Sequence, residues 1–415
     1  MKSWRPNWQI SVLPGLSITG LIILTRLFGL FQPLEWKVFD LSLRWRPAEA
    51  PDPRITVVTI TEDDLQNVLE YPISDRTLAE VIQTLQTYQP RAIGIDMFRD
   101  QPVGEGFEEL TKTLQSFDNV VGIYRIEPAI PPLPTLSDGQ LGFVDVLVDN
   151  DGFLRRSLLG SADAEDNYRF SFTVQLASKY LVDEGIMLEN GIRDPETMRF
   201  GSAEIPRFQP NTGAYIRQDN GGNQALINFR AGTQPFTKLS YKTLMSGQAD
   251  ANLLRDRVVL VGYTAESVKD FVSSGAIAGT TPSLVPGVEI QAHAISQILS
   301  AVIDQRPFLK TLPDSLDYIL ILGAGLLGLV LVYWQRKPLE HLLIVVVVSS
   351  AGLVLSYGLI IASWWVPVVP VVTAFLLNAA VLYPFYQAQE RLRSQLNERQ
   401  LLINQTYNTI HNGPL

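Results

Sequence analysis

The apolar residues of this chain gather in four long runs, one near the beginning and three near the end. A membrane-spanning helix needs about 20 mainly apolar residues. Proline is tolerated in such helices because neighbouring helices satisfy the backbone, so Pro367 and Pro370 do not exclude the last run. No small-residue cleavage site follows the first run, which favours a retained anchor over a signal peptide. The pattern therefore predicts four transmembrane helices, over residues 10–31, 316–334, 342–362 and 364–386.

The basic residues near these runs predict the orientation of the chain. Cytoplasmic ends of membrane helices carry an excess of lysine and arginine. If all four spans are real, three basic groups fall on one side: Lys2 and Arg5, then Arg336 and Lys337, then Arg391, Arg393 and Arg399. We therefore expect a multi-pass protein of the plasma (inner) membrane, with residues 1–9 and 387–415 in the cytoplasm and residues 32–313 outside.

The segment between the first and second runs has the pattern of an α/β domain. Residues 54–61 are nearly all β-branched or apolar, which indicates a strand buried on both faces. Ser74 or Asp75 then provides an N-cap for an amphipathic helix over residues 77–88, and residues 92–98 return as a strand. Further strands are expected at 120–126 and 257–262, and a helix at 286–299. We predict a mainly parallel sheet with flanking helices, plus an antiparallel lobe or insertion within residues 164–238.

Polar side chains follow several of these strands, where open α/β sheets bind ligands. One interpretation is an acidic cluster that holds a cation or a basic small molecule. The other, which we favour, is structural: Asp63 and Asp64 cap the next turn, and Asp96 pairs with an arginine such as Arg76. The candidate ligand-binding residues are Glu62, Asp63, Arg76, Asp96 and Tyr263.

Composition narrows the function classes. The net charge of −9 and the absence of a basic face exclude a nucleic-acid partner, and the absence of cysteine excludes disulfides and cysteine-bound metals. Asp149-Asn-Asp-Gly152 has the spacing of half a calcium loop without the later acid, so we expect an Asx turn. His293 lies on an apolar helix face and is expected in the core. No hydrolase, zinc-protease or P-loop motif occurs, so binding is favoured over an outward-facing enzyme, and no metal site is expected.

Several stretches resemble the second type of CHASE domain, an extracellular sensory domain of cyclases and histidine kinases. In order they span most of residues 35–300, which makes the resemblance specific, although Ile73 departs from the aromatic residue usual at that position. The resemblance implies one anchor helix before the domain, three helices after it and an intracellular output module. The stretches are Phe39–Arg46, Thr61–Leu65, Tyr71–Arg76, Arg91–Phe98, Asp149–Arg156, Ile227–Arg230, Arg257–Tyr263 and Pro286–Ile290.

An amphipathic helix is expected to continue the helix of the fourth apolar run. Its apolar residues recur at three, four and seven positions, although Arg399 interrupts the seam. The spacing predicts a short parallel coiled coil, and hence a homodimer, with a solvated juxtamembrane helix as the alternative. The apolar positions are Leu392, Leu396, Ile403, Tyr407 and Ile410.

The last residues, Ile410–Leu415, are similar to the phosphoacceptor box of a histidine kinase subfamily, with His411 as the phosphoacceptor. Asn412 stands where the family usually has an acid that can act as a base. The resemblance implies the sensor half of a histidine kinase, with a response regulator as partner; ATP and Mg²⁺ would bind only a kinase domain beyond this sequence, and no cofactor is expected here. A nucleotide cyclase or serine/threonine kinase output is the alternative. The predicted partners at the membrane are lipid and an unknown extracytoplasmic small-molecule or ionic signal.

Overall fold

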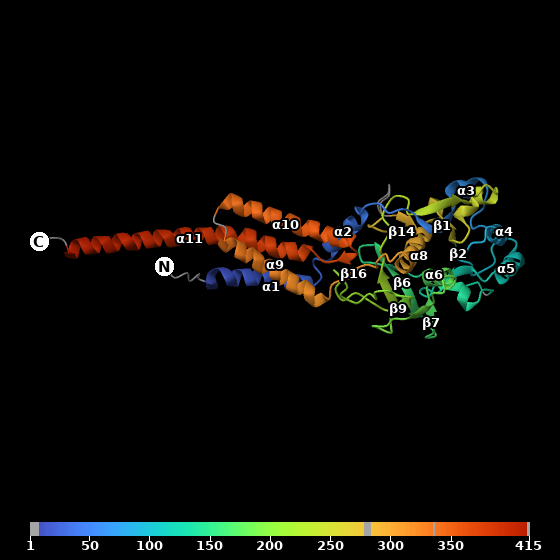
Figure 1. Ribbon diagram of the computed structural model, residues 1–415, viewed down its shortest axis with the longest axis horizontal. Helices are drawn as coiled ribbons and strands as arrows, with labels where there is room; N and C mark the ends of the chain where they lie inside the picture. Colours follow the sequence, from blue (N-terminus) through green and yellow to red (C-terminus); the bar gives the residue numbers. More distant parts are fainter. Residues whose placement is uncertain (1–7, 134, 278–283, 335–336, 413–415) are drawn as a thin grey trace. The chain divides into compact units, whose positions relative to one another are not determined.

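The computed structural model describes the backbone of residues 8–133, 135–277, 284–334 and 337–412, and side chains from residue 12 to residue 407 within these ranges (Figure 1). The chain forms two compact units. The helical unit contains residues 1–36, 211–217 and 311–415, and the sheet unit contains residues 37–210 and 218–310. Each unit is described below by itself.

A six-stranded sheet is the centre of the sheet unit. Its order is β12-β1-β13-β2-β3-β4, and every neighbouring pair of strands is parallel. The predicted α/β fold with a mainly parallel sheet is therefore confirmed. The strands are β1 (Asp52–Ile60), β2 (Ala92–Asp96), β3 (Val120–Tyr124), β4 (Leu141–Phe143), β12 (Phe236–Ser240) and β13 (Val258–Tyr263).

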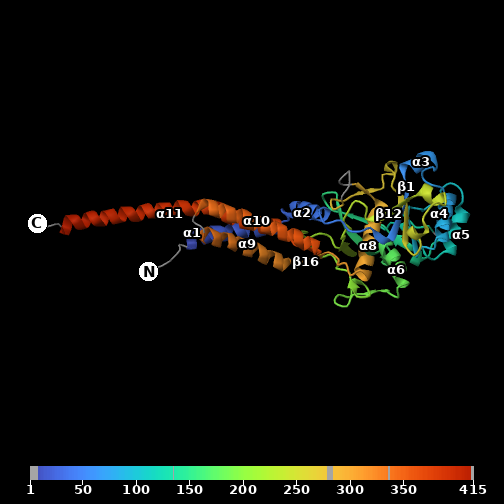
Figure 2. The same cartoon turned by 45° about the horizontal axis from the view of Figure 1, so that its top comes forward.

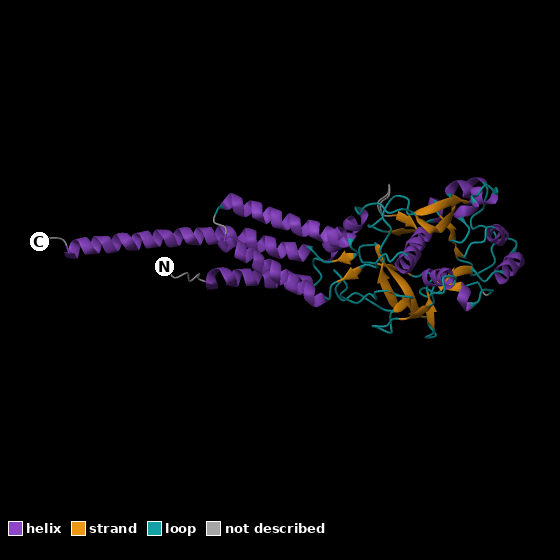
Figure 3. Cartoon of the chain, viewed as in Figure 1, coloured by secondary structure: helices purple, strands orange, loops and turns teal. Residues whose placement is uncertain are grey.

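Helices cover both faces of this sheet (Figure 3). On one face, α4 (Asp75–Thr87), α5 (Phe107–Ser116) and α7 (Tyr241–Met245) contribute to a buried apolar cluster. On the other face, α6 (Phe172–Val182) and α8 (Gly287–Ile303) do the same. The predicted N-cap of α4 is confirmed, because the Ser74 hydroxyl accepts a hydrogen bond from the Thr77 amide at 3.2 Å. The sheet is thus buried on both sides, and its strand ends are free to carry side chains of a site.

An antiparallel lobe joins the same unit, as predicted for the polar middle segment. One sheet pairs β6 (Leu154–Ala162) with β5 (Val146–Val148), β7 (Tyr168–Phe170) and β11 (Asn223–Leu226). A second consists of β8 (Leu188–Asn190), β9 (Met198–Phe200) and β10 (Ala203–Glu204). The remaining elements are α3 (Glu62–Asn67), β14 (Phe271–Ser273), β15 (Leu284–Pro286) and three 3₁₀ turns, η1 (Asp138–Gln140), η2 (Ala251–Leu253) and η3 (Glu266–Val268).

In the part of the chain that the structure describes, three helices of the helical unit are long and apolar enough to cross a membrane, whereas the sequence predicted four. They are α9 (Asp314–Trp334), α10 (Pro338–Ile361) and α11 (Val369–Asn412). The first apolar run forms α1 (Trp8–Leu27), which qualifies only when its residues 12–27 are counted together with α2 (Gln32–Arg44), across a bend of 78°. The helix ends before the apolar run does, and Gly29 follows with φ +74°, a left-handed conformation that a helix interior does not contain.

The start of the last predicted helix also differs from the prediction. Trp364 and Trp365 form the short strand β17, which pairs with β16 (Lys310–Thr311), and α11 begins only at Val369. At its other end α11 continues past residue 386 into the amphipathic helix, as the sequence predicted. It continues as one helix of 44 residues, which Figure 2 shows passing the ends of the other helices. The candidate membrane helix and the predicted amphipathic helix are therefore a single element.

Close packing within the helical unit depends on small residues. A Cβ on Gly325 would lie 2.3 Å from the Thr19 hydroxyl, and one on Gly328 would lie 2.7 Å from the Phe375 carbonyl. The Asn378 amide donates a hydrogen bond to the Thr19 hydroxyl at 3.0 Å. Small residues and interhelical hydrogen bonds are the usual means of packing helices in a membrane. This contact joins α1, α9 and α11.

Candidate functional site

The carboxyl edge of the six-stranded sheet brings several of the predicted site residues together. Asp96 is the last residue of β2 and pairs in register with Gly262 of β13. Tyr263, the last residue of β13, pairs with Ile60 of β1, and the acidic run starting at Glu62 follows directly. We call this region the carboxyl-edge site. Its central place is taken by β13, which lies between β1 and β2 although it comes last of the three in the chain.

Asp96 is the most unusual group of the carboxyl-edge site. Its residue is 8% exposed, and burial, with the nearby Asp270 carboxylate as a second cause, raises its pKa to about 8. Burial also raises the pKa of Asp270, against the attraction of Arg125. At neutral pH Asp96 therefore carries a proton and can donate a hydrogen bond. Once ionised, the two carboxylates would attract a cationic group.

The expected pairing of Asp96 with Arg76 is wrong. The described ion-pair partners of Arg76 are Glu105 and Glu109, at 2.7 and 3.9 Å, and both partners belong to the region of α5. The sequence could not reveal the real neighbour of Asp96, because Asp270 follows a strand whose place in the sheet is not encoded locally.

The acids after β1 mainly hold the short helix α3. Thr61 is its N-cap, and the Asp64 carboxylate accepts hydrogen bonds from the Thr61 amide at 2.9 Å and from its hydroxyl at 2.7 Å. The Asp63 carboxylate accepts a hydrogen bond from the side-chain amide of Asn67 at 2.8 Å. Hydrogen bonds from Ser267 lower the pKa of Glu62. The structural interpretation thus describes Asp64 well, and Glu62 and Asp63 keep exposed carboxylates.

Tyr263 fixes a turn beside the carboxyl-edge site. Its hydroxyl accepts a hydrogen bond from the Ile73 amide at 3.3 Å, and its ring meets the ring of Tyr71 at 5.4 Å. Arg99 donates to the Ile73 carbonyl at 2.9 Å and lies 3.5 Å from the carboxylate of Asp75, which is fully buried. Burial raises the pKa of Tyr263, so its hydroxyl stays protonated. Sequence reasoning missed Arg99, which stands in no motif, and it considered Asp75 only as a helix cap.

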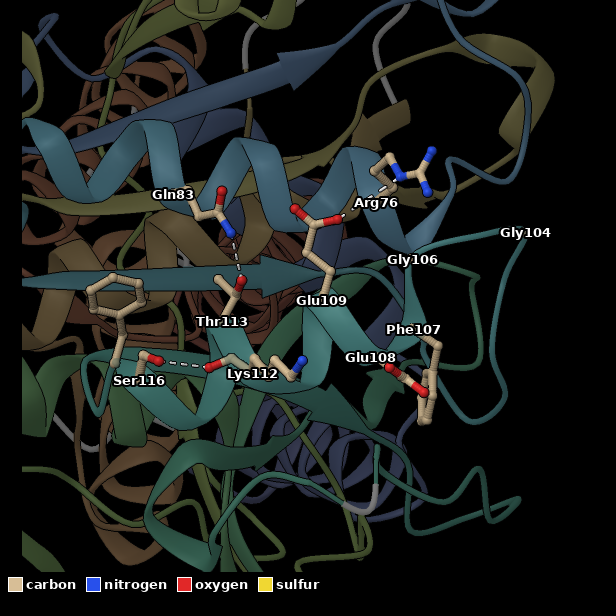
Figure 4. Close-up of a pocket in the computed structure, with 11 residues that line it drawn as sticks. Arg76, Gln83, Gly104, Gly106, Phe107, Glu108, Glu109, Lys112, Thr113 and Ser116 are labelled. Carbon is tan, nitrogen blue, oxygen red and sulfur yellow. Dashed lines mark hydrogen bonds and ion pairs between the residues drawn. The ribbon is translucent and has the colours of Figure 1, made fainter.

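Arg76 lies in a separate surface pocket of about 770 Å³ between α4 and α5 (Figure 4). Figure 4 shows its guanidinium beside Glu109, and the Gln83 amide donates a hydrogen bond to the Thr113 hydroxyl at 2.8 Å across the same pocket. Lys112 is a further basic lining residue. The pocket is open and charged, which suits a small polar ligand better than an apolar one.

The half calcium loop at residues 149–152 holds arginines instead of a metal. The Asp149 carboxylate accepts hydrogen bonds from Arg155 at 2.9 Å and from Arg156 at 2.7 Å. Asp151 accepts a hydrogen bond from the Phe153 amide at 3.2 Å, as the Asx turn requires. Among the residues that the structure describes, no group of three or more His, Cys, Asp or Glu side chains is placed to hold a metal.

The prediction for His293 is confirmed, whereas the prediction for His411 is not tested. His293 is 1% exposed, and its Nδ1 accepts a hydrogen bond from the Arg230 amide at 3.1 Å, which confirms its place in the core. Burial, with nearby arginines adding to the effect, lowers its pKa to about 3, so the ring is neutral. The backbone of His411 is helical within α11, but its side chain lies outside the described part of the chain.

One comparison with known proteins gives a match. The model of the CHASE2 domain family matches residues 18–330, about three quarters of the chain. No curated protein and no solved structure matches it. The matched region includes the whole sheet unit, the end of α1 and most of α9.

Proposed function

We infer that this chain, which belongs to the CHASE2 domain family of extracellular sensory domains, is a membrane-anchored receptor for two-component signalling. The sheet unit would detect a small-molecule or ionic signal outside the membrane. The helices of the helical unit would transmit that signal to a histidine kinase output in the cytoplasm, with a response regulator as the next partner.

The observation that carries this proposal is the continuity of α11. The helix begins inside an apolar stretch and runs without a break for 44 residues, to Asn412. At a rise of about 1.5 Å per residue it extends for about 66 Å, roughly twice the ~30 Å of a hydrocarbon core. A continuous helix of this length can carry a displacement from one face of a membrane to the phosphoacceptor position proposed for His411.

We propose the carboxyl-edge site as the place of signal detection, with Glu62, Asp63, Asp96 and Tyr263 as ligand-binding residues. The carboxylates favour a cation or a basic small molecule, and Tyr263 would couple the ligand to the turn at Ile73. We also propose Arg76 as a ligand-binding residue, at the separate α4–α5 pocket. A ligand acts only through its differential affinity for two arrangements of the receptor, and a homodimer joined along α11 would supply two such arrangements.

The orientation can be tested with single cysteines, because the natural chain contains none. Tyr71 and Tyr407 are 59% and 60% exposed, so Tyr71→Cys and Tyr407→Cys are both open to labelling. In intact cells a membrane-impermeant maleimide should label Tyr71→Cys at once, and Tyr407→Cys only after permeabilisation. Labelling of both positions in intact cells would overturn the receptor proposal.

The ligand class can be tested with calcium chloride and spermidine as probes, on the full chain in lipid nanodiscs. A ligand that binds only the folded protein raises its stability by RT ln(1 + [L]/Kd). We expect one of these cations to raise the melting temperature, and Asp96→Asn to abolish that rise. An unchanged rise in Asp96→Asn, or no rise with either probe, would exclude the carboxyl-edge site as a cation site.

The output can be tested from the coding sequence beyond codon 415. A histidine kinase ATP-binding domain would support the proposal, whereas a nucleotide cyclase or serine/threonine kinase domain would support the alternative output. Given a kinase domain, acid-labile phosphate should appear on the natural protein after addition of ATP and Mg²⁺, and it should be absent from His411→Gln. Phosphorylation that persists in His411→Gln would exclude this histidine as the phosphoacceptor.

A further inference from the structure

A loop of seven residues, Asn211–Arg217, connects the two units in an unusual way. It belongs to the helical unit, although the chain on both sides of it, up to Pro210 and from Gln218, belongs to the sheet unit. The two residues that flank the loop are joined by a hydrogen bond from the Gln218 amide to the Pro210 carbonyl at 3.0 Å. The chain passes between the units at four places, after residues 36, 210, 217 and 310, and this 211–217 loop provides two of them.

Aromatic side chains of the helical unit enclose the 211–217 loop. Gly213 has φ +57°, and a Cβ there would lie 2.5 Å from the ring of Trp365. Tyr215 is fully buried and packs against Trp36 and Trp365, with ring centroids 5.2 and 5.9 Å away. The Ile216 amide also donates a hydrogen bond to the side chain of Gln32 at 2.9 Å. The loop is therefore docked specifically, and Gly213 is needed for both its conformation and its fit.

Arg26 binds the loop from the last turn of α1. Its side chain is 1% exposed, and its guanidinium donates hydrogen bonds to the Gly213 carbonyl at 2.6 Å and to the Ala214 carbonyl at 3.3 Å. A buried guanidinium needs several acceptors in fixed positions. The backbone carbonyls of the loop supply them here.

Asp317, in the first turn of α9, is the charged partner of Arg26, at a distance longer than an ordinary hydrogen bond. The closest nitrogen of Arg26 is 3.7 Å from its carboxylate, and the side chain of Asp317 is 3% exposed. Both carboxylate oxygens are buried, and neither has a hydrogen-bond partner among the described residues. The Nε atom of Arg26 is likewise buried and unpartnered. A buried carboxylate without hydrogen bonds is costly, and a two-point arginine–carboxylate pair would remove that cost.

The loop carbonyls and Asp317 therefore compete for one guanidinium. We propose that Arg26 is a two-position switch that holds the 211–217 loop in the docked state and closes on Asp317 when the loop withdraws. Since the loop is continuous with the sheet unit at both ends, its withdrawal is a direct way for that unit to change the contact between α1 and α9. The purpose assigned to the switch rests on the proposed receptor function, but the exchange of partners does not.

The switch can be tested by labelling Ala214→Cys in the full chain, reconstituted in nanodiscs. Ala214 is 1% exposed, so a maleimide reaches this cysteine only when the loop withdraws. Arg26→Gln removes the charge that holds the loop and should raise the labelling rate at least tenfold. Asp317→Asn removes the competing acceptor and should leave the rate unchanged or lower it. If Asp317 merely positioned Arg26, its removal would instead release the loop.

Ala177→Cys, in the fully buried core of the sheet unit, is the control and should stay unlabelled in every variant. If it reacts in Arg26→Gln, that variant is unfolded and Arg26→Lys is used, which keeps the charge but loses the two-point fork; a smaller rise is expected. No rise in the folded variant, or an equal rise in Asp317→Asn, would overturn the switch. The labelling needs no ligand and no output, so its failure leaves the orientation test of the receptor function unaffected.

Discussion

Arg155 and Asp40 form a two-point ion pair across 115 residues of sequence. The guanidinium of Arg155 donates to both oxygens of the Asp40 carboxylate, at 2.9 and 2.7 Å, and is itself 1% exposed. It also donates to Asp149, whose side chain is fully buried. Burial raises the pKa of Asp40, and the hydrogen bonds from Arg155 oppose this rise. One arginine thus neutralises carboxylates from α2 and from the segment before β6.

We expect Arg155→Met to destabilise the sheet unit strongly. The variant removes the described ion-pair partner of Asp40 and one of the arginines that bind Asp149, and removing one member of a buried ion pair costs about 3–5 kcal/mol. Hydrogen exchange of the β6 amides in the full chain would measure this loss. Arg199→Met is the matched control, because its ion pair with Glu189 is partly exposed and should contribute about 1 kcal/mol or less. Equal losses in the two variants would contradict the importance of the buried network.

Asp96 should make the sheet unit less stable as the pH rises. Its pKa is about 8 in the folded chain against 3.8 for an ordinary aspartate, so the folded state retains the proton over this range. The contribution of Asp96 to the free energy of unfolding is therefore complete below about pH 3.8. It is lost as the pH rises towards 8, by at most about 1.4 kcal/mol per pH unit. Asp96→Asn cannot ionise and should remove this slope, which hydrogen exchange of the β2 amides would show. A slope that is unchanged in Asp96→Asn would mean that another group titrates.

His293 should make the sheet unit less stable as the pH falls, which is the opposite of the effect of Asp96. Its folded pKa of about 3 lies below the ordinary 6.5, because burial excludes the charged ring. The unfolded chain binds the extra proton, so stability is complete above about pH 6.5 and is lost as the pH falls towards 3. His293→Asn keeps an acceptor for the Arg230 amide and should remove this loss, although the smaller side chain lowers stability at every pH. The measurement is the exchange of α8 amides between pH 4 and 7, and an acid loss as large as that of the natural chain would contradict it.

The elements of the sheet unit were predictable where local chemistry determines them. The β-branched run predicted both ends of β1 to within two residues, and Ser74 predicted the start of α4. Both predictions succeeded because burial and capping act over short distances. The first apolar run does not qualify as a membrane helix by itself, because apolar composition does not reveal the break at Gly29. The pairing of Asp96 was wrong because β13 enters the sheet between β1 and β2 from far along the chain. Side-chain partners that depend on strand order, such as Asp270, cannot be read from spacing.

The C-terminal part of α11 gives the last prediction, that two chains meet along it. Leu392, Leu396 and Ile403 are 59%, 56% and 64% exposed in the single chain, and their spacing fits the seam of a parallel coiled coil. In that arrangement Leu396 faces its copy, whereas Ser394 lies on the opposite side of the helix.

We therefore expect Leu396→Cys in native membranes to form a disulfide-linked dimer rapidly under mild oxidation, and Ser394→Cys to do so at least tenfold more slowly. Replacing the seam residue in Leu392→Lys should suppress the Leu396→Cys dimer, because a charge in a coiled-coil seam is unfavourable. Equal rates for the two cysteines would instead indicate a solvated helix that collides at random. That result would require the signal to leave the membrane through one chain rather than through a pair.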